Sequence, residues 1–156
     1  MPIRKLKYQK YLNELPNCPP IHYKVFKENA FRWIFRHRLS DSFMPLNVTK
    51  EPPQRMLDDS ELMCKGFGLS FFDTYAHAFA RYEALYKRKR GVSHEAFTLE
   101  KGDSIAKLEM IENEGIFGDI NDENGHFTFH EFEETELAKN VLTIEDIFDN
   151  NGKFKR

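Results

Sequence analysis

The sequence predicts one α+β domain, built from a small mixed or antiparallel sheet, an N-terminal helix and one long amphipathic helix at about 74–90. Its 156 residues suffice for one domain and are too few for two comfortable cores. Hydrophobic residues make up 40% of the chain and charged residues 31%, which is a globular composition. Helical and alternating patterns follow in the order helix, strands, helix, strands, which favours α+β over a wound βαβ sheet. We expect the domain to cover 1–149 and a loose tail to cover 150–156.

The first third of the chain predicts a helix, two strands and a long connection. Apolar residues at helical spacing over 3–15 predict a short helix, which Pro16 ends. Alternating residues over 21–27 and 31–37 predict two strands, with Asn29-Ala30 as the hairpin turn between them. Residues 39–62 are rich in Pro, Asp and Ser, and they predict a long loop.

The rest of the chain has sharper signals. Residues 66–72 predict a short apolar strand, and Asp73 or Thr74 is placed to cap the helix that follows. Residues 91–103 predict a loop, and the apolar run from Ile105 to 111 predicts a buried strand. Asn124-Gly125 is a strong hairpin signal before an alternating strand at 126–133, and a last strand or helix pair is expected at about 136–148.

Several classes of protein are disfavoured by composition. The chain has no apolar run of the ~18 residues that a membrane helix needs, and its first residues lack the apolar segment of a signal peptide. Cys18 and Cys64 fit no metal-ligand spacing, so reduced thiols and a cytoplasmic location are expected. The segment 120–131 resembles a calcium loop, but Ile120 occupies its first ligand position, and no metal site is predicted.

Charge is distributed unevenly along the chain. Residues 1–90 carry 17 Lys and Arg against 9 Asp and Glu, a balance of +8, and residues 91–156 carry 6 against 16, a balance of −10. A basic half can attract phosphate-bearing ligands, and an acidic half can supply carboxylates or cover a basic partner. The two halves can equally attract each other within one fold.

Three segments contain residues suited to nucleotide chemistry. Phe31 to Arg36 alternates aromatic rings with Arg32 and Arg36. Ser70 lies in the strand before the predicted long helix and is followed by Phe71 and Phe72. Glu131 and Glu133 form a Glu-x-Glu step in a later strand. This order resembles the arginine–serine–glutamate arrangement of the ADP-ribosyltransferase superfamily, whose members transfer ADP-ribose from NAD.

The resemblance implies a role for each residue. Arg32 or Arg36 would clamp a phosphate of NAD with its planar fork of donors. Ser70 would hydrogen-bond the nicotinamide ribose or hold the local geometry, and the rings of Phe71 and Phe72 would stack on nicotinamide. Glu133 would be the catalytic glutamate that stabilises the developing sugar cation, assisted by Glu131.

Two departures from the family pattern are visible. Phe71 and Phe72 stand where the family has further hydroxyl residues after the serine, and a second Glu-x-Glu step occurs at 134–136. The resemblance still implies a small transferase or NAD glycohydrolase, such as a toxin or defence factor, with a nucleic-acid or protein acceptor.

Two other functions compete with this interpretation. Arg32, Arg36 and Arg38 between aromatic residues would suit an RNA-binding protein, and His130 beside Glu131 would suit a metal-independent ribonuclease. The acidic C-terminal half would suit a non-catalytic antitoxin or regulatory protein that covers a basic partner.

Overall fold

A computed structural model describes residues 4–25, 28–110 and 114–155, and it confirms the α+β class. Seven strands form one sheet in the order β1-β5-β6-β3-β2-β4-β7, and every neighbouring pair is antiparallel. The strands are β1 Lys24–Val25, β2 Asn29–Ile34, β3 Leu69–Phe72, β4 Ser104–Glu109, β5 Gly115–Phe117, β6 His126–Glu131 and β7 Val141–Asp146.

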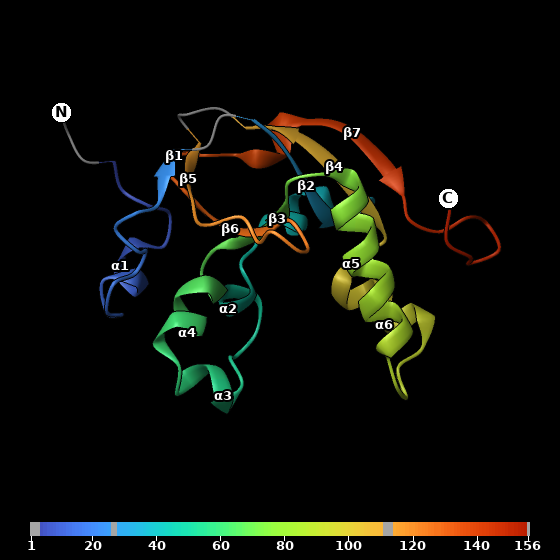
Figure 1. The fold of residues 1–156 in the computed structure, drawn as a ribbon, viewed down its shortest axis with the longest axis horizontal. Coiled ribbons are helices and arrows are strands. Elements are labelled where there is room, and N and C mark those ends of the chain that lie inside the picture. The colour runs from blue at the N-terminus through green and yellow to red at the C-terminus, as the bar shows by residue number, and fades with distance from the viewer. Residues whose placement is uncertain (1–3, 26–27, 111–113, 156) are drawn as a thin grey trace.

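The helices fall into groups along the chain. Below the sheet in Figure 1, α2, α3 and α4 form one group and α5 and α6 form another, and α1 lies near the N-terminus. The α-helices are α1 Gln9–Leu12, α2 Leu46–Thr49, α3 Gln54–Leu57, α4 Ser60–Gly66, α5 Tyr75–Arg88 and α6 His94–Lys101, and the 3-10 helices are η1 Leu39–Phe43 and η2 Leu137–Asn140.

Each face of the sheet buries its own core. Because side chains alternate along a strand, Phe31 and Trp33 of β2 point to one face, and Ala30 and Ile34 point to the other. The first face packs against α5, whose Tyr82 is fully buried. The second face includes Phe71 and packs against Leu39 of η1 and residues of η2. Both faces are therefore covered over the middle of the sheet.

The junction between β2 and β3 divides the sheet. Of the described residues, Phe31 and Phe72 form the one pair in register between these two strands. β2 pairs with β4 over six positions, and β3 pairs with β6 over four. Next to this pair, Nη1 of Arg32 in β2 donates to the carbonyl of Ser70 in β3 and links the two strands.

Several elements differ from the sequence-based predictions. The N-terminal helix is one turn at Gln9–Leu12 within the predicted 3–15, and residue 3 of that range lies outside the described part. The hairpin at Asn29-Ala30 is wrong, because both residues belong to β2 and because β1 pairs with β5 at the sheet edge. Without a turn glycine, alternation alone could not specify which strands pair.

The two predicted loops contain helices. The segment 39–62 contains η1, α2, α3 and the start of α4, and the segment 91–103 contains α6. Pro45 and Pro53 occupy the N-cap positions of α2 and α3, so the prolines that indicated a loop instead mark helix starts. Thr74 caps α5 by accepting a hydrogen bond from the His77 N–H, in line with one of the two predicted caps.

The described residues of the C-terminal tail contact the rest of the domain. Phe154 pairs with Phe148 in an isolated bridge, and the Lys155 N–H donates to the Ile147 carbonyl. The Phe154 ring packs against Tyr86 at 5.2 Å and Phe79 at 5.8 Å between centroids. These contacts place the half-buried Phe154 ring against α5, and the domain boundary at 149 stays a prediction.

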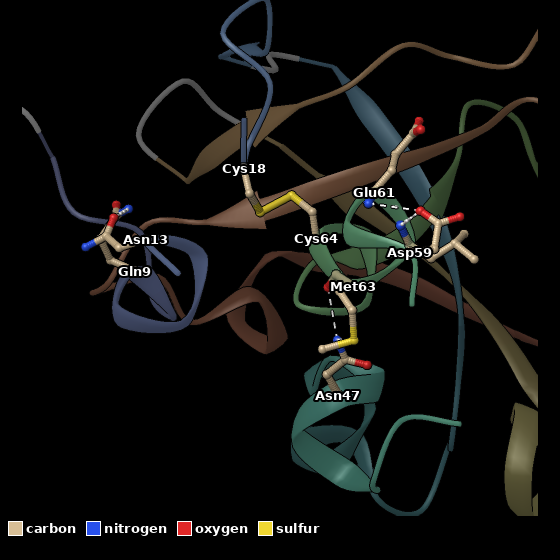
Figure 2. Close-up of a disulfide and its surroundings, with 9 residues drawn as sticks. Gln9, Asn13, Cys18, Asn47, Asp59, Glu61, Met63 and Cys64 are labelled. Carbon is tan, nitrogen blue, oxygen red and sulfur yellow. Dashed lines mark hydrogen bonds between the residues drawn. A yellow bond between two sulfur atoms is a disulfide. The ribbon is translucent and has the colours of Figure 1, made fainter. Parts of the chain in front are cut away.

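Cys18 and Cys64 form a disulfide between the N-terminal segment and α4 (Figure 2). The prediction of reduced thiols is therefore wrong. The spacing of the two cysteines gave no indication that residues 46 positions apart meet. The cytoplasmic location stays a prediction. Within the described ranges, no helix has the length and apolar character needed to cross a bilayer.

Candidate functional site

A cavity of about 690 Å³ lies between the two helical groups, and residues of β2 and β3 form part of its wall. Its volume is within the range of small-molecule sites. α4 supplies Lys65, and α6 supplies Glu100 and Lys101. The strand residues that line it include Arg32, Trp33, Ser70 and Phe72.

The Arg32 side chain links β2 to η1 and to β3. Its Nε donates to the Ser42 carbonyl at 2.9 Å, and its Nη1 donates to the Ser70 carbonyl at 2.8 Å. The guanidinium carbon lies 5.9 Å from the centre of the Phe43 ring and 5.8 Å from that of Phe71. Burial lowers the pKa of Arg32 to about 10, so the group is still charged at neutral pH. These bonds use two of the five guanidinium donors and orient a fixed positive charge at the cavity wall.

Ser70 presents its hydroxyl from the middle of β3. The residue is exposed, while Leu69, Phe71 and Phe72 around it are buried. Its Oγ lies 3.0 Å from Nε2 of His126, the first residue of β6. Since Ser70 pairs with Thr128 in the β3–β6 ladder, His126 is its diagonal neighbour on the same face.

Positive charge surrounds this serine and histidine. Burial lowers the pKa of His126, and the charges of Lys65, Arg81 and Arg32 lower it further. Arg38 and Lys101 also line the cavity, together with the carboxylates Asp41 and Glu100. Glu100 lies 3.4 Å from Lys50 and 3.7 Å from Lys101, which partly neutralises it.

Aromatic rings form a rigid part of the wall. Trp33 stacks on Phe72 with 5.4 Å between ring centroids, and its indole Nε1 donates to the Ala78 carbonyl at 2.9 Å. The Phe72 ring also contacts His126 edge-on at 5.5 Å. Packing and hydrogen bonding therefore hold the indole and the imidazole in place.

The structure separates Arg36 and Phe71 from this cavity. Arg36 lies beyond the end of β2, where its Nε lies 2.5 Å from Asp146 Oδ1 and its Nη2 donates to the Ile144 carbonyl at 3.0 Å. Phe71 is fully buried in the core on the opposite face. Of the residues predicted to hold a cofactor, Arg32 and Phe72 line the cavity.

The two predicted catalytic glutamates lie outside the cavity lining. Glu131 is buried at the end of β6, on the face opposite the Ser70 hydroxyl, and its Oε2 accepts from Lys7 Nζ at 2.8 Å. Glu131 lies four residues after Phe127, the strand partner of Phe71. Four residues correspond to about 13 Å along β6. Glu133 follows the strand as an exposed residue, and its backbone N–H donates to the Lys5 carbonyl.

His126 and Lys65 are site residues that sequence reasoning missed. The alternation of 126–133 correctly placed His126 and His130 on one face, but only the β3–β6 register brings His126 to Ser70. His130 is buried beside Tyr23 and Gly68, and neither ring nitrogen has a hydrogen-bond partner among the described residues.

The described residues contain no cluster of three or more His, Cys, Asp and Glu side chains suited to a metal ion. The site therefore consists of one cavity with a fixed arginine, a serine–histidine pair and an aromatic wall. Comparison with protein-family models, with curated proteins and with solved structures finds no match to this chain.

Proposed function

We propose that the cavity binds NAD and that the protein is an ADP-ribosyltransferase or NAD glycohydrolase. The observation that carries the proposal is the meeting of Arg32 and Ser70, from different strands, at one cavity with an aromatic wall. Arg32 and Ser70 are the arginine and the serine that the resemblance indicates, and the Arg32 guanidinium donates to the Ser70 main-chain carbonyl. The acceptor would be a protein or a nucleic acid.

The charges around the cavity suit a pyrophosphate. Arg32, Arg38, Lys65 and Lys101 surround the space, and two phosphates of a dinucleotide would bring two negative charges to them. Trp33 is half-buried and lines the cavity beside Phe72, so its indole would offer an apolar contact for an aromatic ring such as nicotinamide. Together these groups favour a small anionic ligand that carries a ring.

The same geometry weighs against RNA binding by the aromatic strand. Phe31 and Trp33 pack under α5, and Arg36 is bound to Asp146. The Arg38 guanidinium lies over its neighbour Phe35 at 4.2 Å. The interleaved rings and guanidiniums therefore do not form a continuous exposed platform on which bases could stack.

The carboxylate that stabilises the sugar cation is a separate question. Glu131 and Glu133 are the residues that the resemblance indicates, and Glu100 and Asp41 are carboxylates that line the cavity. Glu133→Ala, Glu131→Gln and Glu100→Gln variants separate these assignments. The variant that abolishes nicotinamide release while it retains NAD binding identifies the catalytic carboxylate.

The test of the proposal is NAD binding by calorimetry, together with nicotinamide release with and without cell extract. Arg32→Lys is expected to weaken NAD binding at least about tenfold, because an ammonium cannot reproduce the guanidinium fork. Arg36→Lys is the matched control, since Arg36 lies outside the cavity lining and its substitution should leave NAD binding unchanged. Thermal unfolding of both variants checks that the fold is intact. Absence of NAD binding by the folded wild-type protein would overturn the proposal.

A further inference from the structure

The contact between Ser70 and His126 suits a catalytic step as well as ligand binding. Ser70 Oγ and His126 Nε2 lie 3.0 Å apart, which is the geometry of a hydroxyl and a base that accepts its proton. Ser70 is exposed and lines the cavity, so a bound substrate can approach its oxygen. A nucleophile and its base therefore meet at the wall of the proposed NAD site.

The surroundings of His126 favour its neutral form, which is the form that can accept a proton. Burial and the positive charges of Lys65, Arg81 and Arg32 hold the pKa of His126 below its ordinary value. Phe72 packs edge-on against the imidazole and restrains its orientation. The same positive charges would stabilise negative charge that develops on Ser70 Oγ.

Other proton acceptors at the cavity are less well placed. Glu100 pairs with Lys50 at 3.4 Å and with Lys101 at 3.7 Å. Glu131 is bound to Lys7 on the opposite face of the sheet. Among the described residues that line the cavity, Ser70 is the one whose side-chain hydroxyl lies within hydrogen-bond distance of a histidine nitrogen.

We propose that Ser70 is a covalent nucleophile, with His126 as its general base, and that ADP-ribose passes through Ser70 on its way to the acceptor. This inference rests on the proposed function. Ser70 Oγ bonds to C1′ of the nicotinamide ribose while the C1′–N bond breaks, and neutral nicotinamide leaves with the bonding electron pair. The Ser70 proton moves to His126 Nε2.

In the second half of the reaction, Ser70 becomes the leaving group and His126 becomes the proton donor. Water or an acceptor hydroxyl bonds to C1′, the C1′–Oγ bond breaks, and Oγ takes back the proton from His126. The proton of the incoming nucleophile is released to solvent, which restores the balance of protons and electrons. Two displacements at one carbon retain its configuration, whereas a single displacement inverts it.

The experiment uses the full chain, NAD and methanol as a small acceptor. Wild-type protein should give methyl ADP-ribose with the β configuration of NAD retained, as read by NMR. Ser70→Ala and His126→Ala should each lower nicotinamide release at least about 100-fold, while calorimetry shows NAD affinity within about fivefold of wild type. His77→Ala is the matched control, because His77 is another histidine of this region but pairs with Asp73 at 2.6 Å.

The outcomes separate this inference from the proposed function. Product with inverted α configuration, or nicotinamide release by Ser70→Ala within about fivefold of wild type, overturns the covalent role and leaves the NAD site standing. Absence of NAD binding by the wild-type protein overturns both. Equal loss of activity in His77→Ala would show that His126 acts only through the local fold.

Discussion

Lys7 Nζ lies 2.8 Å from Glu131 Oε2, and the pair joins the N-terminal segment to the end of β6 across 124 positions of the chain. The same ammonium donates to the Thr135 carbonyl at 2.6 Å. The Glu131 side chain is 2% exposed, so its charge depends on this partner more than on water. A residue that the sequence marks as catalytic thus has a structural contact to the first described residues.

Lys7→Met should destabilise the fold, by about 2–4 kcal/mol at pH 8, because it leaves a buried carboxylate without its counter-charge. Burial already raises the pKa of Glu131, and loss of Lys7 removes an effect that lowers it. With the folded pKa above the unfolded one, stability falls as pH rises between the two values, so the loss should be smaller at pH 5. Urea unfolding at both pH values measures it. Adding Glu131→Gln should recover part of the loss at pH 8, and an unchanged stability of Lys7→Met would contradict the importance of the pair.

His130→Leu should stabilise the protein, and more so in acid. Burial lowers the pKa of His130 to about 4, from 6.5 in the unfolded chain. Between these two pH values the unfolded state therefore binds a proton at this histidine, and the folded state does not. The free energy of unfolding falls as the pH drops from 6.5 towards 4, by up to about 3 kcal/mol. Leucine removes this dependence and the unpaired ring nitrogens. The difference in unfolding free energy between variant and wild type should be larger at pH 4.5 than at pH 7, and an equal difference would count against a neutral buried His130.

Reduction of the Cys18–Cys64 disulfide should lower the free energy of unfolding by about 3–4 kcal/mol, as expected for a bridge between residues 46 positions apart. Thermal melting with and without dithiothreitol measures the loss. The Cys18→Ser/Cys64→Ser double variant should melt like the reduced protein and show no response to dithiothreitol. A response in the double variant would assign the effect of the reductant to something other than this bridge.

Lys65→Ala should weaken NAD binding about three- to tenfold and flatten its dependence on salt, because an exposed cation near the bound phosphates would be lost. Lys87→Ala is the matched control. Both lysines pair with a glutamate one turn earlier, Lys65 with Glu61 and Lys87 with Glu83, but only Lys65 lines the cavity. Calorimetry at two salt concentrations gives the comparison. Equal effects of the two substitutions would indicate attraction by net charge alone.

Local sequence patterns predicted the strands that pack against the cores. They could not predict which strands pair when the partners lie far apart in the sequence. The alternation in 126–133 correctly assigned Phe127 and Phe129 to one face, because side-chain direction in a strand depends on neighbouring residues alone. The pairing of β1 with β5 depends on residues about 90 positions away, and no local pattern reports it. Helices of four residues, such as α2 and α3, are too short to show a helical period in the sequence.

The candidate site shows the same difference between what local patterns predict and what depends on non-local packing. Arg32, Ser70 and Phe72 were singled out by residue type and order, and they line one cavity. His126 could not be connected to Ser70 without the β3–β6 register, and Lys65 could not be connected to either without the packing of α4. Glu131 was identified by motif, but its burial against Lys7 depends on an N-terminal segment whose position the motif does not contain.

The division of the sheet at the Phe31–Phe72 pair has a consequence for how the chain folds. β1, β3, β5 and β6 lie on one side of the junction, and β2, β4 and β7 lie on the other. The chain therefore passes from side to side almost strand by strand, and neither side can assemble from one contiguous stretch of sequence. Such high contact order predicts slow, all-or-none folding, in which no terminal fragment forms a stable half on its own.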